Sequence, residues 1–379
     1  MASRPERLLR RREDPASATF LELFFDLAFV LVLSQLASAL LDDLTGTGAL
    51  KTALLLAATW WMWTTTTWST DWYTPNAPTM RSLVIAAALA TLLMGAAVPA
   101  ALGGRALLFA IPYVALHVGR VVITSLVLRR HPLGRRSKRI LFWYSISGTL
   151  WVAGAVVPAV RVPLWLTALA IDYSGPSLGW PTPRLGPAHS EELQLTGGHL
   201  SERFQQVFII ALGELVLSAG LTYADTPIDP MRTAAFLLVF ATAVLIGLLY
   251  TAPAGRHLGP AIDRADPSRL APITAYLHLV MVAGLVVTAV GAELVITHPL
   301  QPGPVAVVAA GPTLFLAARV LLSLAIYRRL AWPRLAAVPV MAVATILTVD
   351  LPLLVGSATA TAILGLVVVL DRATLFGGG

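Results

Sequence analysis

Apolar runs long enough to cross a lipid bilayer recur along the whole chain, and short polar segments rich in arginine, proline and glycine separate them. A helix that crosses the hydrocarbon core needs about 20 apolar residues. The matching runs are 17–41, 48–69, 82–102, 105–128, 139–160, 162–174, 204–223, 233–252, 273–297, 304–327, 334–349 and 351–370. This pattern predicts an all-α polytopic membrane protein with about twelve transmembrane helices.

The pattern is ambiguous at two places. The run at 162–174 is short and leads into Ser174-Gly175-Pro176, where a break in the chain is expected. The run is either a full-length helix or a half-helix or re-entrant segment whose broken end offers backbone groups to a cavity. Pro352 separates the last two runs, and if they form one helix the total becomes eleven.

Composition supports a membrane location. Hydrophobic residues make up 57% of the chain, charged residues only 12%, and the mean hydropathy is +0.76. Soluble domains are far more polar. We therefore expect a multi-pass protein of the cell (plasma) membrane, with membrane lipids as partners. The absence of cysteine excludes disulfides, thiolate nucleophiles and cysteine metal sites.

Basic residues are distributed unevenly between the segments that join the apolar runs. With the N-terminus inside, 21 of the 27 lysines and arginines fall in cytoplasmic segments, four fall outside and two fall within helices. Cytoplasmic loops carry such an excess, so both termini are predicted to be cytoplasmic. Basic loops also contact anionic lipid headgroups, which explains the sequence pI near 10.1 without a nucleic-acid partner. The basic N-terminal run lacks the pattern of a removable signal peptide and is expected to anchor the first helix.

One arrangement of proline and arginine occurs twice. Pro112 precedes Arg120 and the pair Arg129-Arg130, and Pro312 precedes Arg319 and the pair Arg328-Arg329; further matches link Glu22 with Glu202 and Gly95-Ala96 with Gly291-Ala292. Copies six helices apart share one orientation, which predicts two parallel six-helix halves, as in one class of transporters. The alternative is a duplicated bundle that transports nothing.

This repeat divides the chain into five parts. They are a basic cytoplasmic arm at 1–16, an N-terminal half at 17–174, a cytoplasmic linker at 175–203, a C-terminal half at 204–372 and a disordered tail at 373–379.

Two carboxylates lie in the first predicted helix. Glu22 and Asp26 are four residues apart and therefore share one face. Ionisation of both carboxyl groups so close to each other and to hydrocarbon would cost much free energy. One of them is therefore expected to hold a proton or to have a cationic partner. The alternative is that they pair with Arg203 or a buried arginine and only fix helix packing.

Glu214 is a second candidate for proton exchange. It lies twelve residues after Glu202, roughly 18 Å deeper along a helix, and is therefore expected near mid-membrane. Gly213 beside it predicts a close helix contact. A carboxylate at this depth is by default a candidate functional residue, with packing as the alternative.

The remaining polar candidates lie in the fourth, sixth, seventh and tenth helices. Arg120 and Arg319 are expected to have acidic or carbonyl partners, since a charge in hydrocarbon costs a few kcal/mol. His117 shares a face with Arg120 and is more typical of packing than of ligand binding. His199 and Glu202 have the spacing of a weak metal or proton-relay pair, and we predict no metal site. Asp172 ends the short sixth run.

Tryptophan is concentrated in the second predicted helix. Trp60, Trp61, Trp63 and Trp68 span about 12 Å along a helix, deeper than an interfacial belt alone would require. Some of these rings are expected to face the interior and to bind a cation or an apolar ligand.

Several segments together resemble one known family. They are Glu22-Leu-Phe-Phe-Asp-Leu-Ala-Phe-Val, Trp60-Trp61-Met-Trp, Gly119-Arg120, Ala170-Ile-Asp172-Tyr-Ser-Gly-Pro176, His199-Leu-Ser-Glu202-Arg203-Phe and Ile209-Ile-Ala-Leu-Gly-Glu214. The chain is similar to the bacterial low-temperature-requirement A (LtrA) family over almost its whole length. The resemblance implies a multi-pass membrane protein but no particular reaction. The chain departs from the family at Ser69-Thr70-Asp71-Trp72-Tyr73 and Gln205-Gln206, which leaves the ligand open.

Two classes of function fit this reading. A proton-coupled transporter or permease accounts for parallel halves and buried carboxylates. An intramembrane enzyme acting on a lipid or prenyl substrate accounts for aromatic rings beside carboxylic acids, which could start a cyclisation. Neither requires a cofactor, and the ligand is an unidentified small or lipid-like molecule. In either case we expect a charge network between the first, fourth and seventh helices, formed by Glu22, Asp26, Arg120, His199, Glu202, Arg203 and Glu214.

Overall fold

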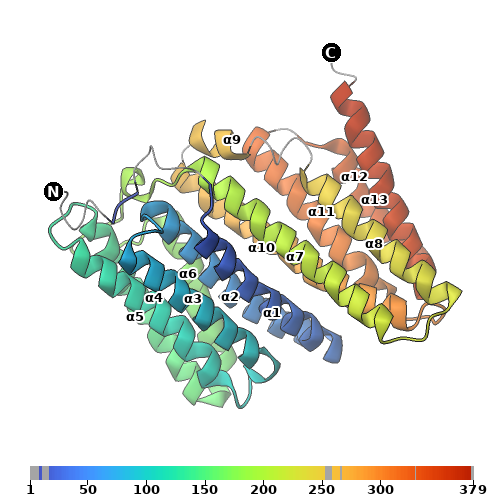
Figure 1. The fold of residues 1–379 in the computed structure, drawn as a ribbon, viewed down its shortest axis with the longest axis horizontal. Helices are drawn as coiled ribbons and strands as arrows, with labels where there is room; N and C mark the ends of the chain where they lie inside the picture. Colours follow the sequence, from blue (N-terminus) through green and yellow to red (C-terminus); the bar gives the residue numbers. More distant parts are fainter. Residues whose placement is uncertain (1–7, 11–16, 252–257, 265–266, 329, 377–379) are drawn as a thin grey trace. The chain divides into compact units, whose positions relative to one another are not determined.

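The computed structural model describes residues 8–10, 17–251, 258–264, 267–328 and 330–376. Within these ranges all the regular secondary structure is helical (Figure 1). Thirteen α-helices are described, and no β-strand is present in the same ranges. Most of the basic arm expected at 1–16 lies outside the described residues. Of the disordered tail expected at 373–379, residues 373–376 belong to the last helix (Leu353–Phe376), and 377–379 lie outside the described residues.

The chain forms two compact units. Unit 1 comprises Met1–Ala39, Asp43–Gln206 and Gly259–Ala275. Its helices are most of α1 (Phe20–Asp42), α2 (Gly46–Trp72), α3 (Pro78–Ala97), α4 (Ala106–Val127), α5 (Gly134–Val156), α6 (Arg161–Leu178), the start of α7 (Gly197–Ala224), nearly all of the short α9 (Leu258–Arg264) and the start of α10 (Pro267–Thr297). Within this unit α4 packs against both α3 and α5, and α5 packs against α6.

Unit 2 comprises Leu40–Asp42, Val207–Leu258 and Tyr276–Gly379. Its remaining helices are α8 (Pro230–Thr251), α11 (Val305–Tyr327), α12 (Trp332–Leu347) and α13 (Leu353–Phe376), with α13 packed against α8, α11 and α12. Glycines let α10 and α11 approach closely. A Cβ at Gly291 would meet the Cα of Val308 at 2.9 Å, and one at Gly284 would meet the carbonyl oxygen of Gly311 at 2.8 Å. Small residues at helix contacts are typical of membrane bundles.

Local sequence explains where the first two helices begin. Thr19 caps α1 and Glu22 returns a hydrogen bond to the Thr19 backbone N–H, which together form a capping box. Thr45 caps α2 by accepting from the Gly48 N–H at 3.0 Å. These caps satisfy backbone donors that a helix start would otherwise leave unpaired.

Helix α2 lies inside unit 1, with Trp60, Trp61 and Trp63 fully buried. Its many hydroxyl groups can be buried because most of them donate to backbone carbonyls one turn earlier, as the Thr66 hydroxyl does to the Met62 oxygen at 2.8 Å. The threonines and tryptophans therefore lower the hydropathy of α2 without leaving most of their polar groups unsatisfied.

Eight helices in the described ranges are both long and apolar enough to cross a membrane. They are α1, α3 with the turn that follows it, α4, α7, α8, α10, α11 and α13. The other four predicted runs coincide with α2, α5, α6 and α12, which fall short of that length or hydropathy. The coarse prediction of an all-helical membrane protein is confirmed.

The structure resolves both ambiguous places in the predicted pattern. The expected break at Ser174-Gly175-Pro176 is wrong, because α6 continues to Leu178. It ends at Gly179, whose φ of +67° is the left-handed conformation that glycine adopts at helix ends. The alternative of one merged helix at Pro352 is also wrong, since α12 ends at Leu347 and α13 begins at Leu353.

Candidate functional site

A buried ion pair joins α1 to α7 within unit 1. The two terminal nitrogens of Arg203 donate to the two carboxylate oxygens of Asp26 at 2.6 and 2.7 Å, and the Trp63 indole N–H donates to the same carboxylate at 2.8 Å. Asp26 and Arg203 are both fully buried. A bidentate guanidinium and carboxylate pair is the strongest ionic geometry available to side chains, so Asp26 has the cationic partner that the sequence predicts.

His199 lies between two other carboxylates. Its Nε2 is 2.9 Å from Glu22 Oε1, and its Nδ1 is 3.1 Å from Asp71 Oδ1. All three side chains are almost completely buried. The Nε of Arg203 is 3.9 Å from Glu22, which links this trio to the pair with Asp26. We call these five residues the charge cluster.

Hydrogen-bond counting shows what the trio within the charge cluster requires. A neutral imidazole carries one N–H, yet both ring nitrogens of His199 face a carboxylate oxygen. Two hydrogen bonds therefore need a second proton, held either on the ring or on one of the carboxyl groups. Without it, a nitrogen lone pair would face an oxygen lone pair in a buried site. The trio therefore holds one proton more than a neutral imidazole carries.

The charge cluster lies at the ends of its helices. Glu22 is in the first turn of α1, Asp71 is in the last turn of α2 and His199 is in the first turn of α7. Asp71 also accepts from the Thr196 backbone N–H at 2.8 Å, just before α7, and the Gly197 N–H donates to Asp263 at 2.7 Å. These aspartates cap α7 and fix the position of His199.

Glu202 makes neutral contacts. Its Oε1 accepts from the Ala18 backbone N–H and from the Gln206 side chain, both at 3.1 Å. The spacing of His199 and Glu202 therefore does not bring them to a common ligand. Among the described residues, no group of three or more acidic or histidine side chains has an arrangement suited to a metal ion.

Arg120 differs from the expectation of an acidic or carbonyl partner. Its Nη1 donates to the Thr66 hydroxyl at 3.2 Å, and within the described ranges no carboxylate lies within salt-bridge distance of it. The expected inclusion of Arg120 in the carboxylate network is therefore wrong. The reason is geometric: Thr66 on α2 contacts Arg120 on α4, whereas Trp63 and Asp71 on the same helix contact Asp26 and His199.

His117 and Asp172 belong to a separate polar group. The Nδ1 of His117 lies 2.8 Å from the Tyr113 carbonyl oxygen and its Nε2 lies 3.2 Å from the Thr65 hydroxyl, so a neutral ring satisfies both contacts. The Tyr113 hydroxyl donates to Asp172 at 2.6 Å. These contacts bridge α2, α4 and α6 and are consistent with packing.

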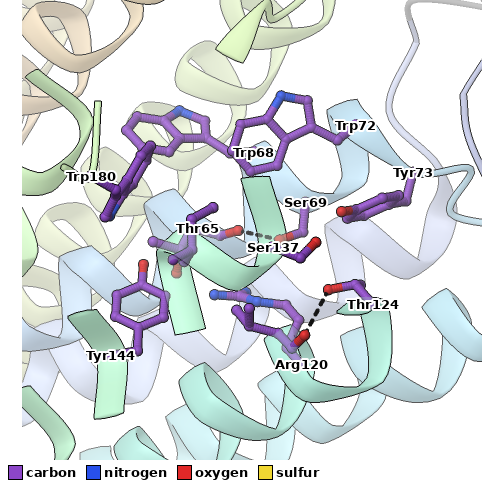
Figure 2. Close-up of a pocket in the computed structure, with 12 residues that line it drawn as sticks. Thr65, Trp68, Ser69, Trp72, Tyr73, Arg120, Thr124, Ser137, Tyr144 and Trp180 are labelled. Atoms are coloured by element: carbon purple, nitrogen blue, oxygen red, sulfur yellow. Dashed lines mark hydrogen bonds between the residues drawn. The ribbon is translucent and has the colours of Figure 1, made fainter. Parts of the chain in front are cut away.

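A hollow opens beside Arg120, bounded by α2, α4, α5 and the loop after α6 (Figure 2). Its volume is ≈ 400 Å³ with its open mouth included. Figure 2 shows Arg120 and Tyr144 on one side and the rings of Trp68, Trp72 and Trp180 on the other. The lining residues are Thr65, Trp68, Ser69, Trp72, Tyr73, Arg120, Val121, Thr124, Ser137, Ile140, Tyr144 and Trp180.

A second arginine contacts the lining of this hollow. The Arg136 guanidinium lies 4.1 Å from the centre of the Trp72 ring and donates to the Tyr73 hydroxyl at 3.0 Å. Its other hydrogen bond goes to the Glu192 backbone oxygen. Neither Arg120 nor Arg136 has a carboxylate within 4.0 Å in the described part of the chain. Arg120 in the lining and Arg136 behind it are therefore two guanidinium groups that no described carboxylate pairs with at salt-bridge distance.

Trp60 and Trp63 do not line this hollow. The indole of Trp60 donates to the Ala275 oxygen at 3.0 Å, and Trp63 stacks on Trp60 and contacts Asp26. The lining includes Trp180, which the sequence analysis did not predict as a site residue. In the charge cluster, Asp71 was likewise not predicted, since the sequence analysis named it only as a departure from a family pattern. The signal for Asp71 was available, because a charged residue in the last turn of a buried helix requires a partner.

Unit 2 contains the remaining candidates. Arg319 is buried and donates to the Leu249 carbonyl oxygen at 3.2 Å, so the prediction of a carbonyl partner is confirmed for this arginine. Glu214 is buried on α7, three turns beyond Arg203. The expected close helix contact at Gly213 is wrong, because a Cβ there would meet no heavy atom within 4 Å.

Comparison with known proteins places the chain in a family. No solved structure matches it. It is 35% identical over 322 residues to the uncharacterized protein RA0937 of Rhizobium meliloti (strain 1021), which covers 82% of this chain and 78% of the relative. Residues 17–369 match the family described as bacterial low temperature requirement A protein (LtrA). The buried charges, the helical membrane architecture and this match together show that the chain belongs to the LtrA family.

Proposed function

We propose that the protein is a proton-coupled permease of the plasma membrane, which moves a small solute or lipid-like ligand. The observation that carries the proposal is the imidazole of His199 between two buried carboxylates. Such a trio binds and releases one proton at a defined position. In this proposal the chain has twelve spans in two parallel halves, with both termini in the cytoplasm.

Proton release from the trio would weaken the contacts that hold α1, α2 and α7 together. If the second proton leaves, His199 can keep a hydrogen bond to Glu22 or to Asp71, but not to both. The helix that loses its contact is then held to α7 more weakly, by the Arg203 pair for α1 or by the Thr196 N–H for α2. This is a two-state element whose balance a proton can bias, as coupling requires. Glu214, deeper on α7, is proposed as a second group that exchanges protons.

The enzyme alternative has less support from the geometry. Acid-initiated cyclisation needs a carboxylic acid facing an aromatic cavity. The described lining of the hollow contains five aromatic residues and no carboxyl group. Its one charged group, Arg120, would repel a developing carbocation. We therefore favour transport.

The experiment uses membrane vesicles from cells that overproduce the protein. The vesicles are incubated with an extract of cellular metabolites under an imposed pH gradient of either direction, and their contents are identified by mass spectrometry. At least one solute is expected to accumulate relative to vesicles without the protein. Collapse of the gradient by a protonophore is expected to abolish that accumulation.

Matched histidine variants connect the result to the charge cluster. His199→Gln, which cannot carry the second proton, is expected to lose gradient-driven accumulation. His298→Gln changes an exposed histidine and is expected to behave like the unaltered protein. Accumulation that persists unchanged after the gradient is collapsed would contradict proton coupling, and no accumulation of any solute would contradict transport.

A further inference from the structure

We infer that the hollow beside Arg120 is a binding site for a small organic monoanion with a flat apolar body, such as an aromatic carboxylate. No residue of the charge cluster lines this hollow. The cluster contacts α2 through Trp63 and Asp71, which are not among the lining residues. The inference depends on three properties of the hollow, which are its charge, its donors and its shape.

Charge is the first property. Arg120 is 96% buried, yet within the described residues it has a single hydrogen bond, to a neutral hydroxyl. Arg136 is 97% buried and contacts Trp72 and Tyr73, both of which line the hollow. Two buried guanidinium groups without a nearby carboxylate are costly, since desolvation of a charge needs compensation by an opposite charge. A bound anion supplies that charge, and a cationic ligand is excluded for the same reason.

Hydrogen-bond donors are the second property. The hydroxyls of Ser69 and Thr124 are already used, because they donate to the backbone oxygens of Thr65 and Val121. The guanidinium of Arg120 and the hydroxyl of Ser137 remain available at the hollow. One planar guanidinium pairs with one carboxylate or sulfonate group. This donor set therefore suits a monoanion better than a phosphate dianion.

Shape is the third property. The rings of Trp68, Trp72 and Trp180 face Arg120 across the hollow (Figure 2), so a ligand whose anionic group meets Arg120 would place its apolar part against indole rings. The ≈ 400 Å³ counted for the hollow includes open solvent at its mouth, so only a small part of this space is enclosed. A ligand would therefore place its anionic group inside, beside Arg120, and its flat apolar body at the mouth against the indole rings.

Binding to this site stands independently of transport, whereas its use as the substrate site of the permease depends on the function proposed above. The test therefore measures binding alone. Purified protein in detergent is dialysed to equilibrium against radiolabelled benzoate, against benzamide, which is its neutral counterpart, and against benzylamine, which is cationic. Benzoate is expected to bind saturably with one site per chain, and at least tenfold more tightly than either of the others.

Arginine variants decide whether the site is the one described. Arg120→Gln is expected to weaken benzoate binding at least tenfold, and Arg120→Lys, which keeps the charge without the planar fork, to weaken it less. Arg105→Gln alters an exposed arginine just before the same helix and is expected to bind benzoate normally. If Arg120→Gln does not fold, Ser137→Phe, which fills the hollow from α5, is expected to give the same loss.

Three outcomes would overturn the inference. They are equal binding of benzoate and benzamide, full benzoate binding by the Arg120 or Ser137 variants, and displacement of benzoate by anionic lipid. The last is measured in nanodiscs of phosphatidylcholine with and without phosphatidylglycerol. Competition by phosphatidylglycerol would assign the site to a lipid headgroup and not to a free anion.

Discussion

Replacing Asp26 with asparagine tests whether the ion pair with Arg203 holds unit 1 together. The change keeps the shape of the side chain and removes its charge. Arg203 then remains buried, with Glu22 at 3.9 Å as its nearest carboxylate. Removing one partner of a buried ion pair typically costs about 3–5 kcal/mol, because the other charge is left uncompensated. Since Glu22 still offsets part of that charge, we expect a loss of about 3 kcal/mol in the free energy of unfolding.

A double-mutant cycle separates the pair from its surroundings. Arg203→Met should also destabilise the protein, since it leaves Asp26 buried with only Trp63 as a donor. Asp26→Asn combined with Arg203→Met removes both charges and keeps similar volume, which completes the cycle. The combined variant is expected to be more stable than the sum of the single changes implies, by about 0.5–3 kcal/mol, as for directly coupled residues.

The assay is equilibrium unfolding in mixed micelles with increasing dodecyl sulfate, followed by tryptophan fluorescence. The control is Asp43→Asn, at a partly exposed aspartate whose pKa is lowered by the Thr45 hydroxyl and by Lys51. Exposed pairs contribute little, so no measurable change is expected there. Additive effects in the cycle would refute the reasoning, because they would mean that Asp26 and Arg203 do not act as a pair.

Four further substitutions test other parts of the structure. Glu214→Gln is expected to insert and fold normally but to lose gradient-driven accumulation in vesicles, and full activity across pH would assign Glu214 to packing. Asp71→Asn removes a charged partner of His199, so solid-state NMR of labelled histidine should show a change in the protonation of that ring, and an unchanged signal would contradict the shared proton. Gly154→Ala would place a Cβ 2.7 Å from Trp165 and should cost about 1–3 kcal/mol in stability, whereas Gly213→Ala meets nothing and should be neutral or stabilising.

The helices of this protein were predictable because their signal is local. Apolar runs mark each helix, and even the capping box formed by Thr19 and Glu22 can be found in four consecutive residues. Only the exact ends of helices were predicted wrongly. At Pro176, for example, α6 continues past the proline and ends before Gly179.

The site was only partly predictable because its contacts join distant residues. The cost of buried charge predicts that Asp26 has a cationic partner, but it does not say which cation. Arg120 carries the same cost, and sequence reasoning assigned it to the carboxylates. The rotation of α2 places Thr66 beside Arg120 instead, and a helix rotation depends on packing over the whole bundle.

The order in which the chain is synthesised affects how the helices that carry the charge cluster enter the membrane. Its three carboxylates leave the ribosome long before their basic partners, since 177 residues separate Glu22 from His199 and 128 separate Asp71 from His199. Until α7 emerges, the helices of unit 1 must enter the membrane with acidic groups that have no counter-charge in this cluster. A chain that stops at residue 196 should therefore be retained by membrane quality control, although it contains six complete helices. In the growing protein, α7 supplies the histidine and the arginine that complete the charge cluster.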